Sequence, residues 1–234
     1  MKLHIVMFAA VVGCGDNQET RDECYPPTVQ AVRCDPGMAT FSLASTNPYY
    51  PLRVGSVTIL EGIEDGKTIR VERRVLPDTE VVMGVTTHVL EARELIDGEI
   101  YEIARNYYVE ASDGTVCYFG EAVEFYENGQ LANRNGSWRA GESGAKPGII
   151  MPAAPAVGDA YFQENAPSIA IDMGRITDVT STMTFQGQSF TNVVTVMDSN
   201  PLDTCDDEET KFYVPGIGES GDTVKLLVSF TPGT

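Results

Sequence analysis

The sequence predicts a mainly β protein, built as a single antiparallel meander that forms a barrel or a strongly curved half-barrel with a long ordered central loop. Short segments rich in Val, Thr, Tyr and Ile alternate apolar with polar residues, which is the period of a half-buried strand. Gly, Asp and Asn separate these segments, and they favour the tight turns of β-hairpins. With 234 residues, of which 42% are hydrophobic, the chain can fill one such core.

Residues 1–13, MKLHIVMFAAVVG, are typical of a lipoprotein signal peptide. Lys2 precedes a short apolar run, and Gly13 stands directly before Cys14. Such a run is too short to span a bilayer as a helix, whereas a basic start, an apolar stretch and a small residue describe an export signal. The string Val11–Cys14 resembles a bacterial lipobox, in which the cysteine carries the lipid. We expect Cys14 to be lipid-attached, so that the membrane is a partner through this lipid; an ordinary secretory signal is the alternative.

Residues 14–23 predict a flexible tether, because they are polar and lack apolar anchors. The position after Cys14 holds Gly15 rather than the Asp that the Gram-negative sorting rule treats as a signal for retention at the inner membrane. The expected location is therefore the bacterial cell envelope, at the outer membrane, on its periplasmic face or at the cell surface.

The rest of the chain predicts sequential hairpins. The strongest turn signal is Asp97-Gly98, which joins two alternating segments. In the first half, the expected strands are 54–61, 67–76, 85–95, 99–110 and 115–119, with turns at 62–66, 97–98, 113–114 and 127–129. In the second half, the expected strands are 182–186, 190–197, 211–214 and 223–230. This gives about nine or ten strands, and no linker interrupts them, so residues 24–234 are predicted to form a single β domain.

The charge balance excludes two kinds of partner. Acidic residues number 34 against 16 Lys and Arg, for a formal net charge of -18. A surface of this sign repels nucleic acid phosphates and anionic lipid head groups. Nucleic acid is therefore not an expected partner.

Four cysteines remain once Cys14 is assigned to lipid: Cys24, Cys34, Cys117 and Cys205. An even number outside the cytoplasm suggests disulfides, with three possible connectivities. The expected pairs are Cys24–Cys34 and Cys117–Cys205. A zinc site is not expected, because close cysteine pairs with histidines are missing, and no other metal or cofactor is predicted.

The central block 136–164 is rich in Gly, Pro and Ala, yet too apolar for a disordered loop. It continues the strings Tyr118–Glu121 and Tyr126–Gly129 with GSWRAGESGAKPGIIMPA at 136–153 and VGDAYFQE at 157–164. These motifs resemble an uncharacterised family of bacterial secreted and lipid-anchored proteins that carries a GSWxAGxxGAxPGIxMPA block followed by VGDxYxQE. The resemblance covers most of residues 47–218 and implies a shared fold, but no activity.

Two kinds of site are expected in this block. Trp138, Met151 and Tyr161 are candidate ligand-binding residues, and a lone Trp beside Gly-rich backbone is equally typical of a core position. Glu142, Asp159 and Glu164, with Asp172 nearby, are candidate catalytic acids and bases. The acidic run at 203–209 lacks the spacing of a calcium loop, and no phosphate-binding or nucleophile-elbow motif is present.

The main functional expectation is a lipid-anchored envelope protein that binds an apolar or amphipathic small molecule in a β-barrel cleft. This rests on a fold-level analogy with lipocalin-like and lipoprotein-carrier-like half-barrels. The alternatives are a carboxylate-dependent hydrolase or lyase of the envelope, and a structural envelope lipoprotein, so whether the protein is an enzyme stays open. An apolar cavity of several hundred Å3 would favour binding, and two converging buried carboxylates would favour catalysis.

Overall fold

The computed structural model describes residues 26–202 and 204–234, without the side chains of residues 204–207. The predicted signal peptide 1–13, the tether 14–23, the lipid site Cys14 and Cys24 lie outside these residues, as does the side chain of Cys205. The described chain holds one short 3-10 helix, η1 (Ala31–Cys34), and one antiparallel sheet. The strands are β1 (Phe41–Ser42), β2 (Val57–Glu64), β3 (Lys67–Val82), β4 (Val85–Ile96), β5 (Glu99–Ala111), β6 (Val116–Glu127), β7 (Gln130–Asn133), β8 (Trp138–Arg139), β9 (Gly148–Met151), β10 (Ala160–Phe162), β11 (Met173–Phe185), β12 (Gln188–Asn200), β13 (Thr204–Val214), β14 (Gly218–Asp222) and β15 (Lys225–Thr231).

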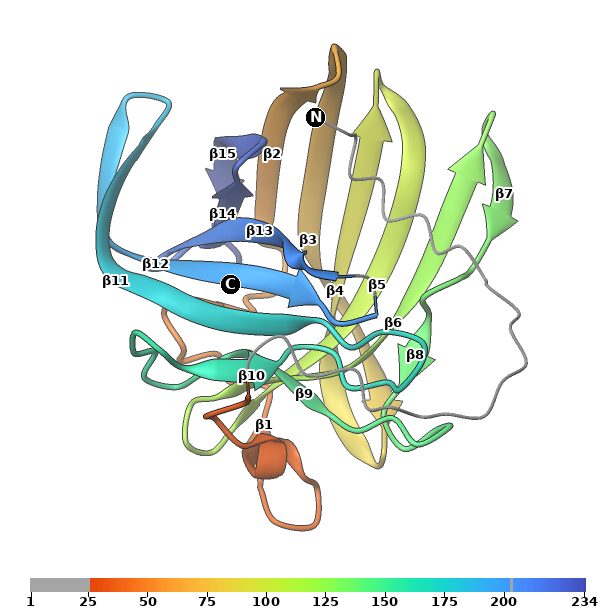
Figure 1. Ribbon diagram of the computed structural model, residues 1–234, viewed down its shortest axis with the longest axis vertical. Helices are drawn as coiled ribbons and strands as arrows, with labels where there is room; N and C mark the ends of the chain where they lie inside the picture. The colour runs from red at the N-terminus through yellow and green to blue at the C-terminus, as the bar shows by residue number, and fades with distance from the viewer. Residues whose placement is uncertain (1–25, 203) are drawn as a thin grey trace.

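The sheet is an antiparallel meander, as predicted, and it is curved rather than closed into a barrel. Its strands follow the order β10-β11-β12-β13-β14-β15-β2-β3-β4-β5-β6-β7. Consecutive strands pair throughout, except that the C-terminal strand β15 pairs with β2 and so joins the two ends of the chain. Figure 1 shows β2–β7 standing as one wall and β11–β13 crossing the lower part of it. We call the side of the sheet enclosed between these strands the inner face.

Two-residue turns set the register of the hairpins. Asp65-Gly66, Asp97-Gly98 and Asn128-Gly129 all have positive φ at both positions. This is the geometry of the tight turns that match the twist of paired strands, and Asn or Asp followed by Gly adopts it with least strain. The predicted hairpin over Asp97-Gly98 is confirmed. Two further turns of this kind, Met83-Gly84 and Gln186-Gly187, were not expected from the sequence.

The long strand β3 runs past its predicted end at Leu76 to Val82. Pro77 falls within a break in the pairing between β3 and β4, from Val75 to Thr79. Proline lacks the amide hydrogen that a regular ladder needs, so it is tolerated at such a bulge. The strand therefore continues beyond the proline that seemed to end it.

The central block extends the sheet instead of filling a barrel mouth. β8 and β9 pair with successive parts of β6, beyond the part that pairs with β7. Trp138, Ile149, Ile150 and Met151 are all buried, with at most 7% of each exposed. Burying apolar side chains of this size contributes about 1.5–3 kcal/mol each, so the block is held as firmly as a strand pair.

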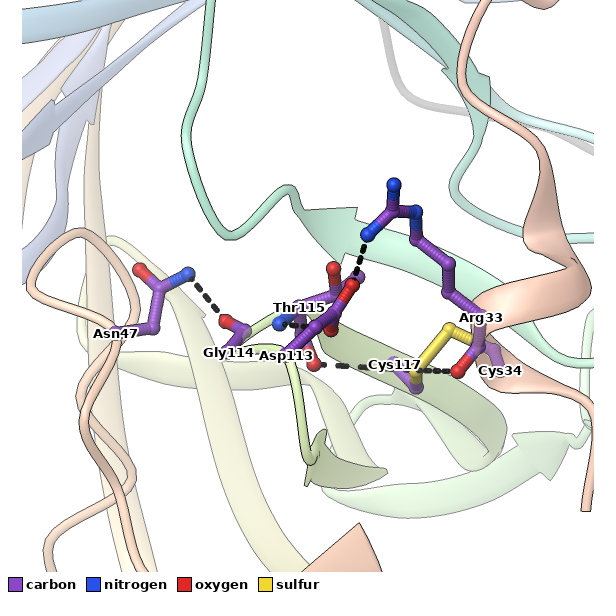
Figure 2. The surroundings of a disulfide bond; sticks show 7 residues. All are labelled: Arg33, Cys34, Asn47, Asp113, Gly114, Thr115 and Cys117. Atoms are coloured by element: carbon purple, nitrogen blue, oxygen red, sulfur yellow. Dashed lines mark hydrogen bonds and ion pairs between the residues drawn. A yellow bond between two sulfur atoms is a disulfide. The ribbon is translucent and has the colours of Figure 1, made fainter. Parts of the chain in front are cut away.

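A disulfide joins η1 to β6, and it corrects both predicted pairings. Cys34 and Cys117 are bonded with their Cα atoms 5.6 Å apart, across 83 residues of sequence (Figure 2). Cys34 therefore cannot pair with Cys24, nor Cys117 with Cys205. The expected pairing of the sequence neighbours failed because the segment around η1 packs on β9 and β6. Closing so long a loop stabilises the fold by about 4.5 kcal/mol in the chain-entropy account.

An ion pair and two hydrogen bonds fix the loop next to this disulfide (Figure 2). Arg33 forms an ion pair with Asp113, whose Oδ1 also accepts a hydrogen bond from the Thr115 amide (3.0 Å). Asn47 Nδ2 donates to the Gly114 carbonyl (2.9 Å). The β5–β6 turn is thus tied to two parts of the N-terminal segment.

Candidate functional site

A row of aromatic side chains crosses the inner face. The ring centroids of Tyr213 and Tyr50 lie 6.2 Å apart, those of Tyr50 and Tyr108 5.1 Å, those of Tyr108 and Tyr118 4.5 Å, and those of Tyr118 and Trp138 5.2 Å. All five side chains are buried. Aromatic rings add packing energy but carry polar ends that need partners, so the partners of this row locate the polar part of the interior.

Three acidic side chains meet at the Trp138 end of the row. Trp138 Nε1 donates a hydrogen bond to Glu164 Oε1 (3.1 Å). Glu164 is in turn hydrogen-bonded to Glu121 and to Asp172. We call Glu121, Glu164 and Asp172 the carboxyl cluster. It joins β6 to the segment between β9 and β11.

The hydroxyl of Tyr118 connects the carboxyl cluster to β5. Its oxygen lies 2.5 Å from Asn106 Oδ1 and 3.0 Å from Glu121 Oε2. A hydroxyl has one proton, so it can donate to only one of these two acceptors. A protonated Glu121 supplies the second hydrogen bond by donating to the Tyr118 oxygen.

The pKa values of the carboxyl cluster agree with this protonation. Burial, reinforced by the charge of Glu102, raises the pKa of Glu121 to about 8. Burial and the charge of Glu121 raise the pKa of Glu164 to about 8. Burial and the charge of Glu164 also raise the pKa of Asp172 well above its ordinary value. At neutral pH these acids therefore keep protons that exposed carboxyls would lose.

Other carboxyls on the inner face have cationic partners. Asp198 accepts from Gln163 Nε2 (2.8 Å) and forms an ion pair with Lys211 (2.5 Å). Glu219 forms an ion pair with Arg73, which links β14 to β3 across the inner face. By contrast, no salt bridge to a residue of the carboxyl cluster occurs within the described chain. Asp172 Oδ1 is buried there without a hydrogen-bond partner.

Carboxyls continue from the cluster along the inner face. Burial and the charge of Glu94 raise the pKa of Glu102 to about 7. Burial also raises the pKa of Glu209 to about 7, with Lys211 acting in the opposite direction. Asp222 is paired with Lys225 (2.7 Å). We call the whole set the inner acidic face; its carboxyls are Glu94, Glu102, Glu121, Glu164, Asp172, Asp198, Glu209, Glu219 and Asp222, and its cations are Arg73, Lys211 and Lys225.

The structure brings together some of the predicted site residues. Glu164, Trp138 and Asp172 form part of the carboxyl cluster or touch it. Tyr161 is fully buried in β10, and its ring lies over Gly174, where an added Cβ would approach to within 2.9 Å of it. Met151 is fully buried in the large core, paired with Val116.

The other two candidate acids lie apart from the cluster. The side chain of Glu142 is 70% exposed and contacts Arg139 (3.6 Å). Asp159 accepts a hydrogen bond from the Ala156 amide in an exposed loop (2.9 Å). Both therefore have the local surface role that an acidic residue takes in the absence of a site.

Sequence reasoning missed Glu121, Tyr118 and Asn106. One signal for Glu121 was the glycine before it in the string Tyr118–Glu121. Gly120 has a φ of +138°, and an added Cβ would lie 2.5 Å from the Trp138 carbonyl oxygen. The glycine is what lets β8 approach β6 closely enough to bring Trp138 beside this strand. For Asn106 the sequence offered no comparable signal.

A small pocket opens beside Arg73 and Glu219 and is bordered by Tyr50, Ser56 and Thr58. Its volume is about 20 Å3, which is room for about one water molecule. It is thus far smaller than the apolar cavity that the barrel expectation required, whereas buried carboxyls do converge at the carboxyl cluster.

Within the residues that the structure describes, no group of three or more His, Cys, Asp or Glu side chains is arranged to hold a metal ion. In the same part of the chain, no helix has the length and apolar character to cross a membrane. No protein-family model, curated protein or solved structure matches the chain.

Proposed function

We propose that this protein is a lipid-anchored protein of the bacterial envelope, held at the outer membrane through Cys14, that binds a polar small molecule on the inner face of its sheet. The observation that supports it is the carboxyl cluster beside Trp138. Desolvating acids without cationic partners costs stability, so such groups are typical of sites that serve a ligand or a reaction. Their presence favours a polar ligand over the apolar or amphipathic one that the sequence suggested.

Fluorescence can test binding directly, because Trp138 is the single tryptophan of the chain and touches Glu164. We expect a polar ligand at the carboxyl cluster to shift or quench the Trp138 emission in a saturable titration. The variant Glu164→Gln should weaken this response at least tenfold, while the exposed control Glu142→Gln should leave it unchanged. A panel of cationic, neutral and anionic small molecules that leaves the emission unchanged would contradict the proposal and favour the structural envelope lipoprotein.

The anchoring part of the proposal has its own test. Replacing Cys14 with Ser removes the sulfur that would carry the lipid, and several acyl chains anchor a protein effectively permanently. We expect the wild type to sediment with outer membranes and Cys14→Ser to appear in the soluble fraction. A variant that still sediments with the outer membrane would contradict anchoring through Cys14.

Acid–base catalysis is a second candidate, and the hydrogen bond between Glu121 and Glu164 favours it. A pair of carboxyls that shares protons near neutral pH holds an acid and a base together. The ionised member can take a proton from water while the protonated member gives one to a leaving group, as in a hydrolase. Turnover of a candidate ester, amide or glycoside that is lost in both Glu121→Gln and Glu164→Gln, but not in Glu142→Gln, would support catalysis.

A further inference from the structure

We propose that the carboxyl cluster is a binding site for a primary ammonium group, and that the ligand is a small alkylamine whose cation sits between Glu121, Glu164 and Asp172. This inference rests on the proposed binding function and names its ligand class. It is argued from the hydrogen bonds of the cluster, from its one unsatisfied oxygen, and from the aromatic rings beside it.

The hydrogen bonds show that protons stand where a cation could stand. Glu164 is bonded to both Glu121 and Asp172. A bond between two carboxyl groups needs a proton on one of them, so the cluster is held together by protons. A bound cation would do the same work while leaving the carboxyls ionised. The cluster therefore has the charge deficit that a cationic ligand fills.

Asp172 shows that the protons alone do not complete the cluster. Its Oδ1 is buried and has no hydrogen-bond partner in the described chain. Leaving a buried acceptor unsatisfied costs roughly 1–3 kcal/mol. Lys211, the nearest cation that affects Asp172, is already paired with Asp198 at 2.5 Å. An additional donor is therefore wanted at this oxygen.

A primary ammonium group matches these needs. It carries three N–H donors in a tripod, enough for one bond to each acid of the cluster. Trp138 and Tyr118 lie at the same place, their ring centroids 5.2 Å apart, and aromatic rings attract ammonium groups and accommodate the attached alkyl carbons. Half-buried Glu121 gives access from the inner face, since Glu164 itself is only 8% exposed.

Two other cations fit less well. The carboxyl cluster is not among groups arranged to hold a metal ion in the described chain. A quaternary ammonium has charge but no N–H donor, so it would leave Asp172 Oδ1 unsatisfied. The preference for N–H donors therefore separates a primary amine from both.

The charged groups around the cluster influence the pH dependence of binding. They come from β5, β6, β12 and β13, and from the segment between β10 and β11. In addition to the three acids themselves, the titratable groups that act on them are Glu102, Tyr108, Tyr118, Asp198 and Lys211. Because the net effect keeps protons on the cluster, a cation must displace protons to bind. Affinity should therefore rise with pH.

The test uses 1,4-diaminobutane as probe, with two comparison compounds. Butane-1,4-diol has the same length without charge, and tetramethylammonium has charge without N–H donors. We expect Trp138 emission to respond to the diamine at concentrations at least tenfold below those needed for either comparison compound. The dissociation constant for the diamine should fall by about tenfold per pH unit between pH 6 and pH 8, since the pKa values of Glu121 and Glu164 are about 8.

Calorimetry of the wild type removes the dependence on variants. Titrations of the diamine in two buffers of different ionisation enthalpy should show about one proton released per ligand. Glu121→Gln and Glu164→Gln should each weaken binding at least tenfold, and Glu142→Gln should not. If binding shows no proton release and no preference for the diamine over the diol, the ammonium inference is wrong although the binding function survives. If no compound of the wider panel binds, both are wrong.

A lipid head group could supply the same chemistry as a free amine. Vesicles of phosphatidylethanolamine and vesicles of phosphatidylcholine separate the two sources, because only the first carries a primary ammonium. A change in Trp138 emission with the diamine but with neither vesicle supports a free amine as ligand. A response to phosphatidylethanolamine vesicles alone would overturn the small-alkylamine part of the inference.

Discussion

Glu164 illustrates how one side chain combines local and global control of its charge. Its neighbour in sequence, Gln163, points to Asp198, whereas Glu164 accepts from the indole of Trp138 and bonds to Glu121. Because burial is the largest cause of its raised pKa, its protonation depends on the whole fold. This is why the sequence could nominate Glu164 as an acid–base candidate but could not pair it with Glu121. One acidic residue among 34 has no local feature that reveals its partner.

The pKa of Glu164 predicts that stability falls as the solution becomes alkaline. The group has a pKa near 4.5 when unfolded and about 8 when folded, so the folded protein binds the extra proton between these values. Its contribution to stability is complete below pH 4.5 and is lost as the pH rises through about 8, at about 1.4 kcal/mol per pH unit. We expect urea unfolding midpoints to decrease from pH 6 to pH 9 in the wild type and in Glu142→Gln. Glu164→Gln should remove much of this decrease, and an unaltered slope would contradict the assigned protonation.

At the scale of elements, local signals predicted what is local. The turn Asp97-Gly98 and its flanking strands follow from nearby residues, and the structure confirms them. Met83 has a φ of 51° at the tip of β3–β4, which its own chemistry does not suggest. The pairing of β15 with β2 and the bond between Cys34 and Cys117 join distant segments, so spacing in the sequence could not reveal them. Burial of the central block was predictable from its composition, but its pairing with β6 was not.

Gly120 is the element-scale test of how β8 is seated on β6. An alanine here would place its Cβ 2.5 Å from the Trp138 carbonyl oxygen, at a φ of +138°. We expect Gly120→Ala to displace β8, to shift Trp138 emission to longer wavelength, and to lower the free energy of unfolding by about 2–4 kcal/mol. Gly129→Ala is the matched control, because its φ is also positive but its added Cβ would meet nothing within 4 Å. Equal effects of the two variants would mean that backbone strain, and not the contact with β8, sets the role of Gly120.

At the scale of the whole molecule, the open sheet needs contacts across its inner face. β14 and β15 pair at a single position, Gly221 with Leu226, whereas β15 pairs with β2 over most of its length. The strands β2–β7 and β10–β14 are therefore connected through a narrow part of the sheet. Tyr50 and Tyr213, with ring centroids 6.2 Å apart, and the ion pair of Arg73 with Glu219 join the two groups of strands inside. These interior contacts hold the curvature that forms the inner face.

The Arg73–Glu219 ion pair should consequently be worth far more than an ion pair at the surface. The two side chains are only 11% and 19% exposed, so removing one charge strands the other in the interior, at a cost of about 3–5 kcal/mol. We expect Glu219→Gln to cause this loss and to speed hydrogen exchange in β14 and β15 more than in β4 and β5. The double variant Arg73→Met with Glu219→Leu should recover much of the stability, since no lone charge remains. In the control pair, Arg134 is 62% exposed, so Arg134→Met should cost about 1 kcal/mol or less. If Glu219→Gln costs no more than Arg134→Met, the two groups of strands are held together by other contacts, and the inner face does not depend on this pair.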